Sequence, residues 1–192
     1  MRRGILTGVA AGLALAAAAV AVGTAPDSDR IVEPFLVKAE VGEVATGRLL
    51  SAAVSGVTLA RTIVVKYRQD AAPISTDGVW VVVDATVTPQ LDILTLSSAQ
   101  LRIGNVHYGV SSLLPEPTML TQGYGAGIPQ RGDLVFEIPR SALDAPGATR
   151  ASIVFLPVVL PRLDTVPAIV VDLTRLEVGN TARIDPVMVV DQ

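Results

Sequence analysis

Apolar and polar residues alternate with a period of two along most of the chain from residue 31 onward, and Gly, Pro and Asp interrupt the pattern. The clearest stretch, residues 79–87, places one set of side chains on one face of a strand and Trp80, Asp84 and Thr86 on the other. Further strands with apolar rows are predicted at 35–41, 50–59, 99–103, 106–110, 132–138, 151–156 and 167–173. The expected core rows include Val79, Val81, Val83, Ala85 and Val87, then Ala99, Leu101 and Ile103, then Leu134, Phe136 and Ile138, and finally Ile153, Phe155, Ile169, Val171 and Leu173.

Three local signals refine this pattern. The apolar phase shifts across Ser55-Gly56, as a β-bulge requires. Gly104-Asn105 occupies the two-residue position that reverses a hairpin. Pro139 lacks the N–H needed to continue a ladder, so the strand over 132–138 is expected to stop there.

Seven or more short strands without a helical period predict an all-β fold, an immunoglobulin-like antiparallel β-sandwich, with a closed barrel as the alternative. We place this domain at residues 33–175. A C-terminal extension follows at 176–192, and its apolar stretch PVMVV is expected to add an edge strand to this domain rather than to another protein.

The N-terminal segment 1–26 has the character of a membrane anchor, and 27–32 form a short linker. Arg2 and Arg3 precede an uncharged run from Gly4 to Gly23, which as a helix would span about 30 Å. The leading arginines predict one N-terminal transmembrane helix with its N-terminus in the cytoplasm and an extracytoplasmic β domain. Secretion after cleavage of a signal peptide is the alternative, because Ala19-Val20-Ala21 fits a cleavage site.

Within this segment, Gly4, Gly8 and Gly12 form a helical stripe that would let a second helix approach closely in lipid. The stripe predicts a membrane protein partner, or self-association. The alternative is that a leader rich in Gly and Ala produces the spacing by chance.

Composition removes several classes of function. The chain has 15 basic and 18 acidic side chains and no basic stripe, so we expect no nucleic acid partner. It contains no cysteine, which excludes a disulfide, a thiolate metal site and a lipid-modified cysteine. The aliphatic core must therefore supply the stability of the domain.

The order of VWVVVDATV, AQLRIG with HYGV, and PQRGDLVFEIP resembles a family of small exported or membrane-anchored immunoglobulin-like domains of Gram-positive bacteria, and is similar to a secreted mycobacterial antigen domain. The resemblance covers roughly residues 33–175. It implies the fold and an extracytoplasmic location, and it supplies no catalytic residue.

Catalytic and metal-binding groups are sparse, and we expect no enzyme activity, no metal and no cofactor. The single histidine, His107, lies on a predicted strand, and no G-x-S-x-G motif accompanies it. Asp84 and Glu137 lie on separate strands and are interpreted as solvated. Asp70 and Asp77 flank one loop without the regular spacing of calcium ligands.

Two further stretches are candidate contact sites. Tyr124, in the stretch GYGAG, is predicted to lie at a loop tip and to contact a partner. The tripeptide Arg131-Gly132-Asp133 matches an adhesion motif but runs straight into a predicted strand, so we interpret it as a chance match.

The sequence therefore leaves two functional hypotheses. The first is a non-enzymatic extracytoplasmic interaction module, a membrane-tethered accessory or scaffold subunit of a membrane or envelope assembly. The second is an extracytoplasmic binding protein for a small or polymeric envelope ligand, bound at the loop end around Tyr124. A deep apolar pocket among those loops would favour the second.

Overall fold

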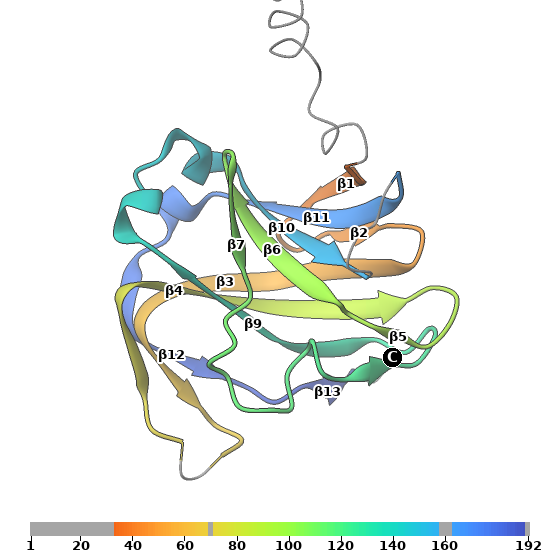
Figure 1. Cartoon of the computed structure of the whole chain (residues 1–192), viewed down its shortest axis with the longest axis horizontal. Coiled ribbons are helices and arrows are strands. Elements are labelled where there is room, and N and C mark those ends of the chain that lie inside the picture. Colours follow the sequence, from red (N-terminus) through yellow and green to blue (C-terminus); the bar gives the residue numbers. More distant parts are fainter. Residues whose placement is uncertain (1–32, 69–70, 158–162, 191–192) are drawn as a thin grey trace, which may run out of the picture. The chain divides into compact units, whose positions relative to one another are not determined.

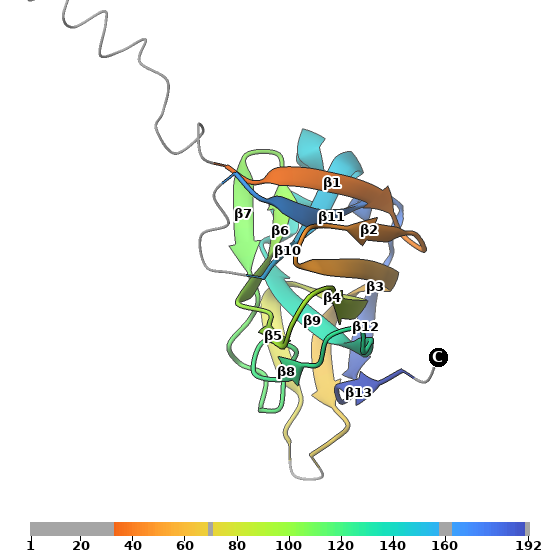
Figure 2. The same ribbon diagram turned by 90° about the vertical axis from the view of Figure 1, so that its right-hand side faces the viewer.

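The computed structural model describes residues 33–68, 71–157 and 163–190 and shows an all-β sandwich (Figures 1 and 2). The five-stranded sheet has the order β1 (Phe35–Glu40), β11 (Thr165–Val171), β10 (Ala151–Leu156), β6 (Ser98–Ile103) and β7 (Val106–Gly109). The six-stranded sheet has the order β12 (Val178–Ile184), β3 (Leu50–Val65), β4 (Ile74–Pro89), β9 (Gln130–Ile138) and β13 (Met188–Val189), and β2 (Val44–Thr46) pairs with β3. A small ribbon joins β5 (Leu94–Thr95) to β8 (Gly123–Tyr124). Three short 3-10 helices lie at Arg140–Ala142, Pro146–Arg150 and Leu173–Arg175.

The expectation of wholly antiparallel sheets is wrong at two edges. β1 pairs in parallel with β11, and β12 pairs in parallel with β3. Hairpins impose antiparallel pairing only on strands that are consecutive in the chain, whereas these partners are far apart in sequence. The direction of such a strand depends on the end of the sheet at which the preceding segment enters, and the alternation pattern carries no information about that.

The predicted apolar rows form the first core, which fills the space between the two sheets. All the predicted core residues named above are buried. Tyr124, Phe136 and Phe155 are the large aromatic members of this core, and most of the rest is aliphatic. Alternation thus predicted correctly which face of these strands turns inward, whereas in the strand predicted at 35–41 Phe35 and Val41 are exposed.

The local signals are confirmed as well. The β3–β4 register shifts between Val54 and Gly56, which is the predicted bulge. Ile103 pairs with Val106 across a two-residue turn in which Gly104 has φ +59°, a left-handed conformation that favours glycine. β9 ends at Ile138, immediately before Pro139.

The six-stranded sheet buries its second face too. Trp80 and Val82 of β4 face away from the first core and join a second core with residues of β3, β9 and β12. The second core comprises Ala60, Ile63, Val65, Trp80, Val82, Leu114, Val135, Ala182 and Ile184. Trp80 is fully buried, and its indole Nε1 has no hydrogen-bond partner.

This second core requires the sheet to curl. Four strand-to-strand steps separate β12 from β13, or about 19 Å in a flat sheet. The chain from Ile184 to Met188 can span only about 14 Å. The two edges must therefore approach each other, and a second register irregularity between Ala60 and Thr62 gives β3 a bend that permits it.

The C-terminal stretch forms both edges of this sheet. β12 continues it beside β3, and β13, within the predicted PVMVV strand, pairs with Gln130 and Arg131 of β9. Figure 1 shows this chain in dark blue, passing from β12 to β13. The domain thus extends beyond residue 175, where the sequence pattern had placed its boundary.

The predicted membrane segment, with Gly4, Gly8 and Gly12, lies outside the described residues. Within the part of the chain that the structure describes, no helix has the length and apolar character needed to span a bilayer.

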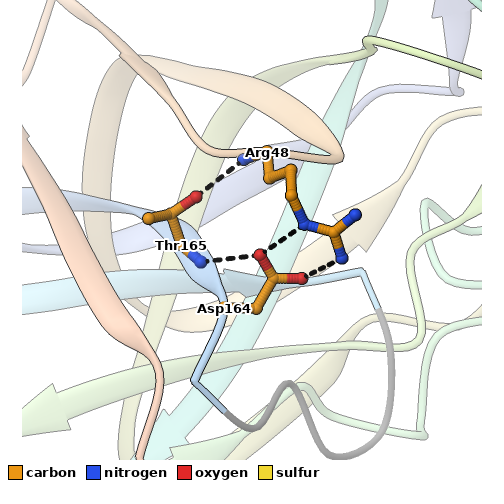
Figure 3. Close-up of polar contacts among 3 residues, drawn as sticks. All are labelled: Arg48, Asp164 and Thr165. Carbon is orange, nitrogen blue, oxygen red and sulfur yellow. Dashed lines mark hydrogen bonds and ion pairs between the residues drawn. The ribbon is translucent and has the colours of Figure 1, made fainter.

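An ion pair ties the two sheets together at one edge (Figure 3). Arg48, in the turn between β2 and β3, donates from Nε to Asp164 Oδ1 at 2.8 Å and from Nη2 to Oδ2 at 2.6 Å. The same carboxylate accepts from the Thr165 N–H at 2.8 Å, at the start of β11. The hydrogen bonds from Arg48 hold the pKa of Asp164 below its ordinary value. The turn packs so closely that a Cβ on Gly47 would lie 2.6 Å from the Thr165 carbonyl oxygen.

We predict that Arg48→Met lowers the stability of the full chain at pH 7, because it strips the cation from a carboxylate whose side chain is only 11% exposed. A carboxyl group with a depressed pKa stabilises the fold only while it is ionised. The difference from the wild type should therefore shrink as the pH falls below about 3.8, the ordinary Asp value.

Urea unfolding at several pH values measures this difference. Arg61→Met is the matched control, since Arg61 is exposed and makes no ion pair among the described residues. A loss of stability at pH 7 that persists unchanged in acid would contradict the assigned role of the pair.

Candidate functional site

The candidate site is a groove of about 600 Å³ on the second face of the six-stranded sheet. Strands β3, β4, β9 and β12 and the link from β12 to β13 contribute its walls. We call it the outer groove and define it by its lining residues: Gly56, Thr58, Val82, Asp84, Arg131, Gly132, Asp133, Thr181, Ala182, Arg183, Asp185, Pro186 and Met188.

The outer groove begins where the second core ends. Val82 and Ala182 belong to both, so they form the apolar boundary between them. Along β4 the same face continues from Val82 to Asp84, and along β9 it continues from Val135 to Asp133. Asp84 and Asp133 are directly opposite each other in the β4–β9 register, so the pairing of two strands brings two carboxylates side by side.

Asp84 is neutralised by a neighbour from the next strand. Arg131 Nε donates to Asp84 Oδ1 at 2.7 Å, and Arg131 Nη2 donates to Oδ2. The fork of the guanidinium thus meets both carboxylate oxygens, and this contact raises the pKa of Arg131. Half of the Arg131 side chain is exposed, so the pair orders the groove wall more than it stabilises the fold.

Asp133 is the unusual group of the site. Burial, helped by the nearby carboxylates of Asp84 and Asp185, raises the pKa of its carboxyl to about 6 against the opposing effects of the Asp185 N–H and of Arg131. The N–H of Asp185 donates to Asp133 Oδ2 at 2.8 Å. Asp133 makes no ion pair within the described residues.

The remaining charges lie at the rim. Lys66 Nζ is 3.3 Å from Asp185 Oδ1. Arg183 is exposed and makes no ion pair among the residues that the structure describes. Apart from these charges, Thr58 and Thr181 contribute hydroxyl groups and Met188 an exposed thioether chain.

Chemically, this set of residues can bind and orient a ligand. It offers carboxylates, guanidinium groups, hydroxyls and an apolar wall, and no lining residue is a histidine or a cysteine. Across residues 33–68, 71–157 and 163–190, no group of three His, Cys, Asp or Glu side chains is arranged to hold a metal ion.

The prediction for Tyr124 is wrong. Its side chain is fully buried in the first core, and its hydroxyl donates to the Met119 carbonyl oxygen at 2.5 Å. Burial raises its pKa well above the ordinary value. The glycines around it suggested an exposed loop tip, but β8 pairs with β5 and turns the ring inward. Tyr124 therefore has no surface with which to contact a partner.

The other candidate residues that the structure describes do not gather at one place. His107 lies exposed on β7, opposite Arg102. Glu137 lies exposed on β9 and accepts a hydrogen bond from the Thr76 hydroxyl. Asp77 is exposed beside it in a second hollow of about 530 Å³, and Asp70 lies outside the described residues. His107, Glu137 and Asp77 do not line the outer groove.

The tripeptide Arg131-Gly132-Asp133 lies within β9, as the strand pattern predicted. Arg131 is engaged by Asp84, and Asp133 accepts the Asp185 N–H, so both charged ends are turned into the groove wall. The motif therefore belongs to the groove and does not project from a loop.

Sequence reasoning missed Asp185 and Arg183 and considered Asp133 only as part of that tripeptide. Alternation could have placed Asp84 and Asp133 on the second faces of their strands. Their meeting depends on which strands pair and in what register. The approach of Asp185 depends on the curl of the sheet, for which the sequence offered only the bulge at Ser55-Gly56.

No protein-family model and no curated protein matches the chain. An uncharacterized β-sandwich protein from Clostridium difficile 630 is similar in structure, with a TM-score of 0.46 and 9% identity, over 71% of this chain and 95% of that one. The yjhA protein from Bacillus subtilis is similar with a TM-score of 0.45 and 14% identity, over 68% of this chain and 98% of that one. Neither likeness carries information on the activity of this chain.

We predict that Asp133→Asn makes the full chain more stable than the wild type at pH 7.5, with the advantage disappearing near pH 4. A buried carboxyl with a raised pKa binds its proton more tightly in the folded state. The wild type therefore loses stability as the pH rises from about 4 through 6, and asparagine does not titrate, while its amide oxygen can still accept the Asp185 N–H.

Urea unfolding followed by the fluorescence of Trp80, the single tryptophan, measures both profiles. Asp77→Asn, an exposed carboxyl on the neighbouring surface, is the control and should leave the pH profile unchanged. Parallel profiles for the wild type and Asp133→Asn would show that Asp133 is not the titrating group.

Proposed function

We propose that the chain is a non-enzymatic extracytoplasmic interaction module, a membrane-tethered accessory or scaffold subunit of a membrane or envelope assembly. The observation that carries this proposal is the outer groove. It is a recessed surface with an apolar wall, charges and hydrogen-bonding groups, held mostly on β-strands and completed by the short link from β12 to β13. Such a surface is suited to recognition without chemistry.

A binding protein for a small or polymeric envelope ligand remains the second candidate. The volume of the groove, about 600 Å³, is within the usual range of about 300–1,000 Å³ for small-molecule sites, which favours this candidate. Burial of Tyr124 removes the loop-end site on which the candidate first rested. If a ligand of this kind binds, the outer groove is where we place it.

The membrane tether is part of the proposal. The run from Gly4 to Gly23 would cross the bilayer with the N-terminus in the cytoplasm and the β domain outside the cell, and secretion after cleavage is the alternative. Gly4, Gly8 and Gly12 would pack against a membrane protein partner or against a second copy of the helix. The lipid bilayer is then the first partner of the chain.

The finer classification is likewise a proposal. We place the sandwich among immunoglobulin-like domains, close to the small exported domains of Gram-positive bacteria and the mycobacterial antigen domain that the sequence resembles. Two packed sheets and an apolar core without a disulfide support it. The two parallel strand pairs would be local variations at sheet edges.

We predict that native membranes retain the chain with residues 4–23 uncleaved. Alkaline carbonate should leave it in the membrane pellet and detergent should release it, because a spanning helix is held by hydrocarbon burial and not by charge. Intact-mass measurement of the released protein reads cleavage directly. A mass that lacks the leader, with the protein in the soluble fraction, would support secretion instead.

We also predict a partner cross-link at the outer groove. A photo-reactive amino acid at Thr181, an exposed lining residue, should yield an adduct with an envelope protein in intact cells. The matched control is the same group at Asn105, exposed in the β6–β7 turn of the other sheet. Adducts that are equal at both positions, or absent from both, would contradict an interaction through the groove.

A further inference from the structure

We infer that the outer groove receives a lysine or arginine side chain of a partner polypeptide, with the cationic head at the Asp133 carboxylate and the aliphatic stem along the apolar wall. This inference rests on the proposed interaction function and names the chemistry that the partner presents. It begins from the cavity and from the way in which the charges around it are paired.

Two of the three carboxylates in the groove already have cations. Asp84 is held by Arg131, and Asp185 lies beside Lys66. Asp133, which is half-buried, has a hydrogen bond from a backbone N–H but makes no ion pair among the described residues. A partner cation would complete a charge pair that the chain leaves open.

The apolar wall gives the rest of such a side chain a place to lie. Val82 and Ala182 form the boundary with the second core, and the exposed side chain of Met188 lines the groove on the β13 side. Lysine and arginine pack their methylene stems on apolar surface while their heads reach polar groups. A cation at the end of an aliphatic chain therefore matches both the wall and the carboxylate.

An anionic ligand fits less well. Arg183 is the only cation of the lining that has no carboxylate partner, and it is exposed to solvent, where water screens its charge. An anion in the groove would also lie near Asp133, the lining carboxylate that makes no ion pair among the described residues. The charges that are already in place thus favour a cation.

Binding should depend on pH. The charged groups around Asp133 are Asp84 on β4, Arg131 on its own strand, and Arg183 and Asp185 at the end of β12, with Tyr67 beyond β3 close enough to be influenced. Burial of Asp133, together with the charges of Asp84 and Asp185, raises its pKa to about 6. A cation binds the ionised form, so affinity should fall roughly tenfold from pH 7.5 to pH 5.

Calorimetric titration of the full chain in a non-ionic detergent tests the inference. The probe is the peptide acetyl-Gly-Ala-Lys-Ala-Gly-amide, and its matched control replaces lysine by norleucine, which keeps most of the stem and removes the charge. We expect saturable binding of the lysine peptide at pH 7.5, at least tenfold weaker binding of the norleucine peptide, and the pH dependence given above.

Three variants locate the site. Asp133→Asn should weaken binding of the lysine peptide at least tenfold, whereas Asp77→Asn should leave the affinity unchanged. Thr58→Lys places a cation of the chain's own at the groove wall and should block the peptide while Trp80 fluorescence reports a folded protein. Thr58→Lys keeps the test valid if Asp133→Asn disturbs folding.

Several results would overturn the inference. They are no saturable binding of the lysine peptide, equal binding of the norleucine peptide, or full binding to both Asp133→Asn and Thr58→Lys. Binding of n-butylamine without binding of the peptide would overturn the assignment to a polypeptide side chain. A Thr181 cross-link without peptide binding would contradict this inference alone. Peptide binding without any cross-link would contradict the proposed function but not the cation site.

Discussion

The curl of the six-stranded sheet is the constraint on which the rest of the molecule depends. In an ordinary sandwich each sheet buries one face, but here β4 buries Val81 and Val83 on one side and Trp80 and Val82 on the other. The second face is buried where the sheet bends at two register irregularities between β3 and β4 and where Leu114, from the segment after β7, packs against it. A chain with few aromatic residues thereby buries additional apolar surface in a second cluster.

The curl also explains why the candidate site contains half-buried charges. The strand faces that carry the second core continue into Asp84 and Asp133. These carboxylates therefore lie on the concave side of the curled sheet and are half-buried. Burying an ionised carboxylate costs several kcal/mol unless other groups compensate. Arg131 compensates Asp84, whereas Asp133 has only the Asp185 N–H, and its pKa is raised accordingly. The ionised Asp133 carboxylate therefore stabilises the fold poorly, and it is positioned to bind a cation.

The sequence could predict whatever depends on neighbours in the chain. Alternation set the inward rows, Gly104-Asn105 set a hairpin, and Pro139 set the end of a strand, because each acts through local backbone geometry. It could not predict the parallel pairing of β1 with β11, which joins segments more than a hundred residues apart. The prediction that Tyr124 is exposed was wrong for the same reason. Glycine-rich surroundings are typical of loops, and the inward direction of the ring depends on the pairing of β8 with β5.

The C-terminal stretch shows how the fold and the site are coupled. It supplies one edge of the curled sheet through β12 and the other through β13, and the link between them contributes Asp185 and Pro186 to the groove. The hydrogen bond from Asp185 N–H to Asp133 therefore does two things at once. It holds the short link against β9, which keeps the sheet curled, and it satisfies one oxygen of the only groove carboxylate without a cation among the described residues. Because one oxygen of Asp133 is already committed to the backbone, a ligand cation would meet a carboxylate fixed in orientation, and loss of that bond would disturb binding and curvature together.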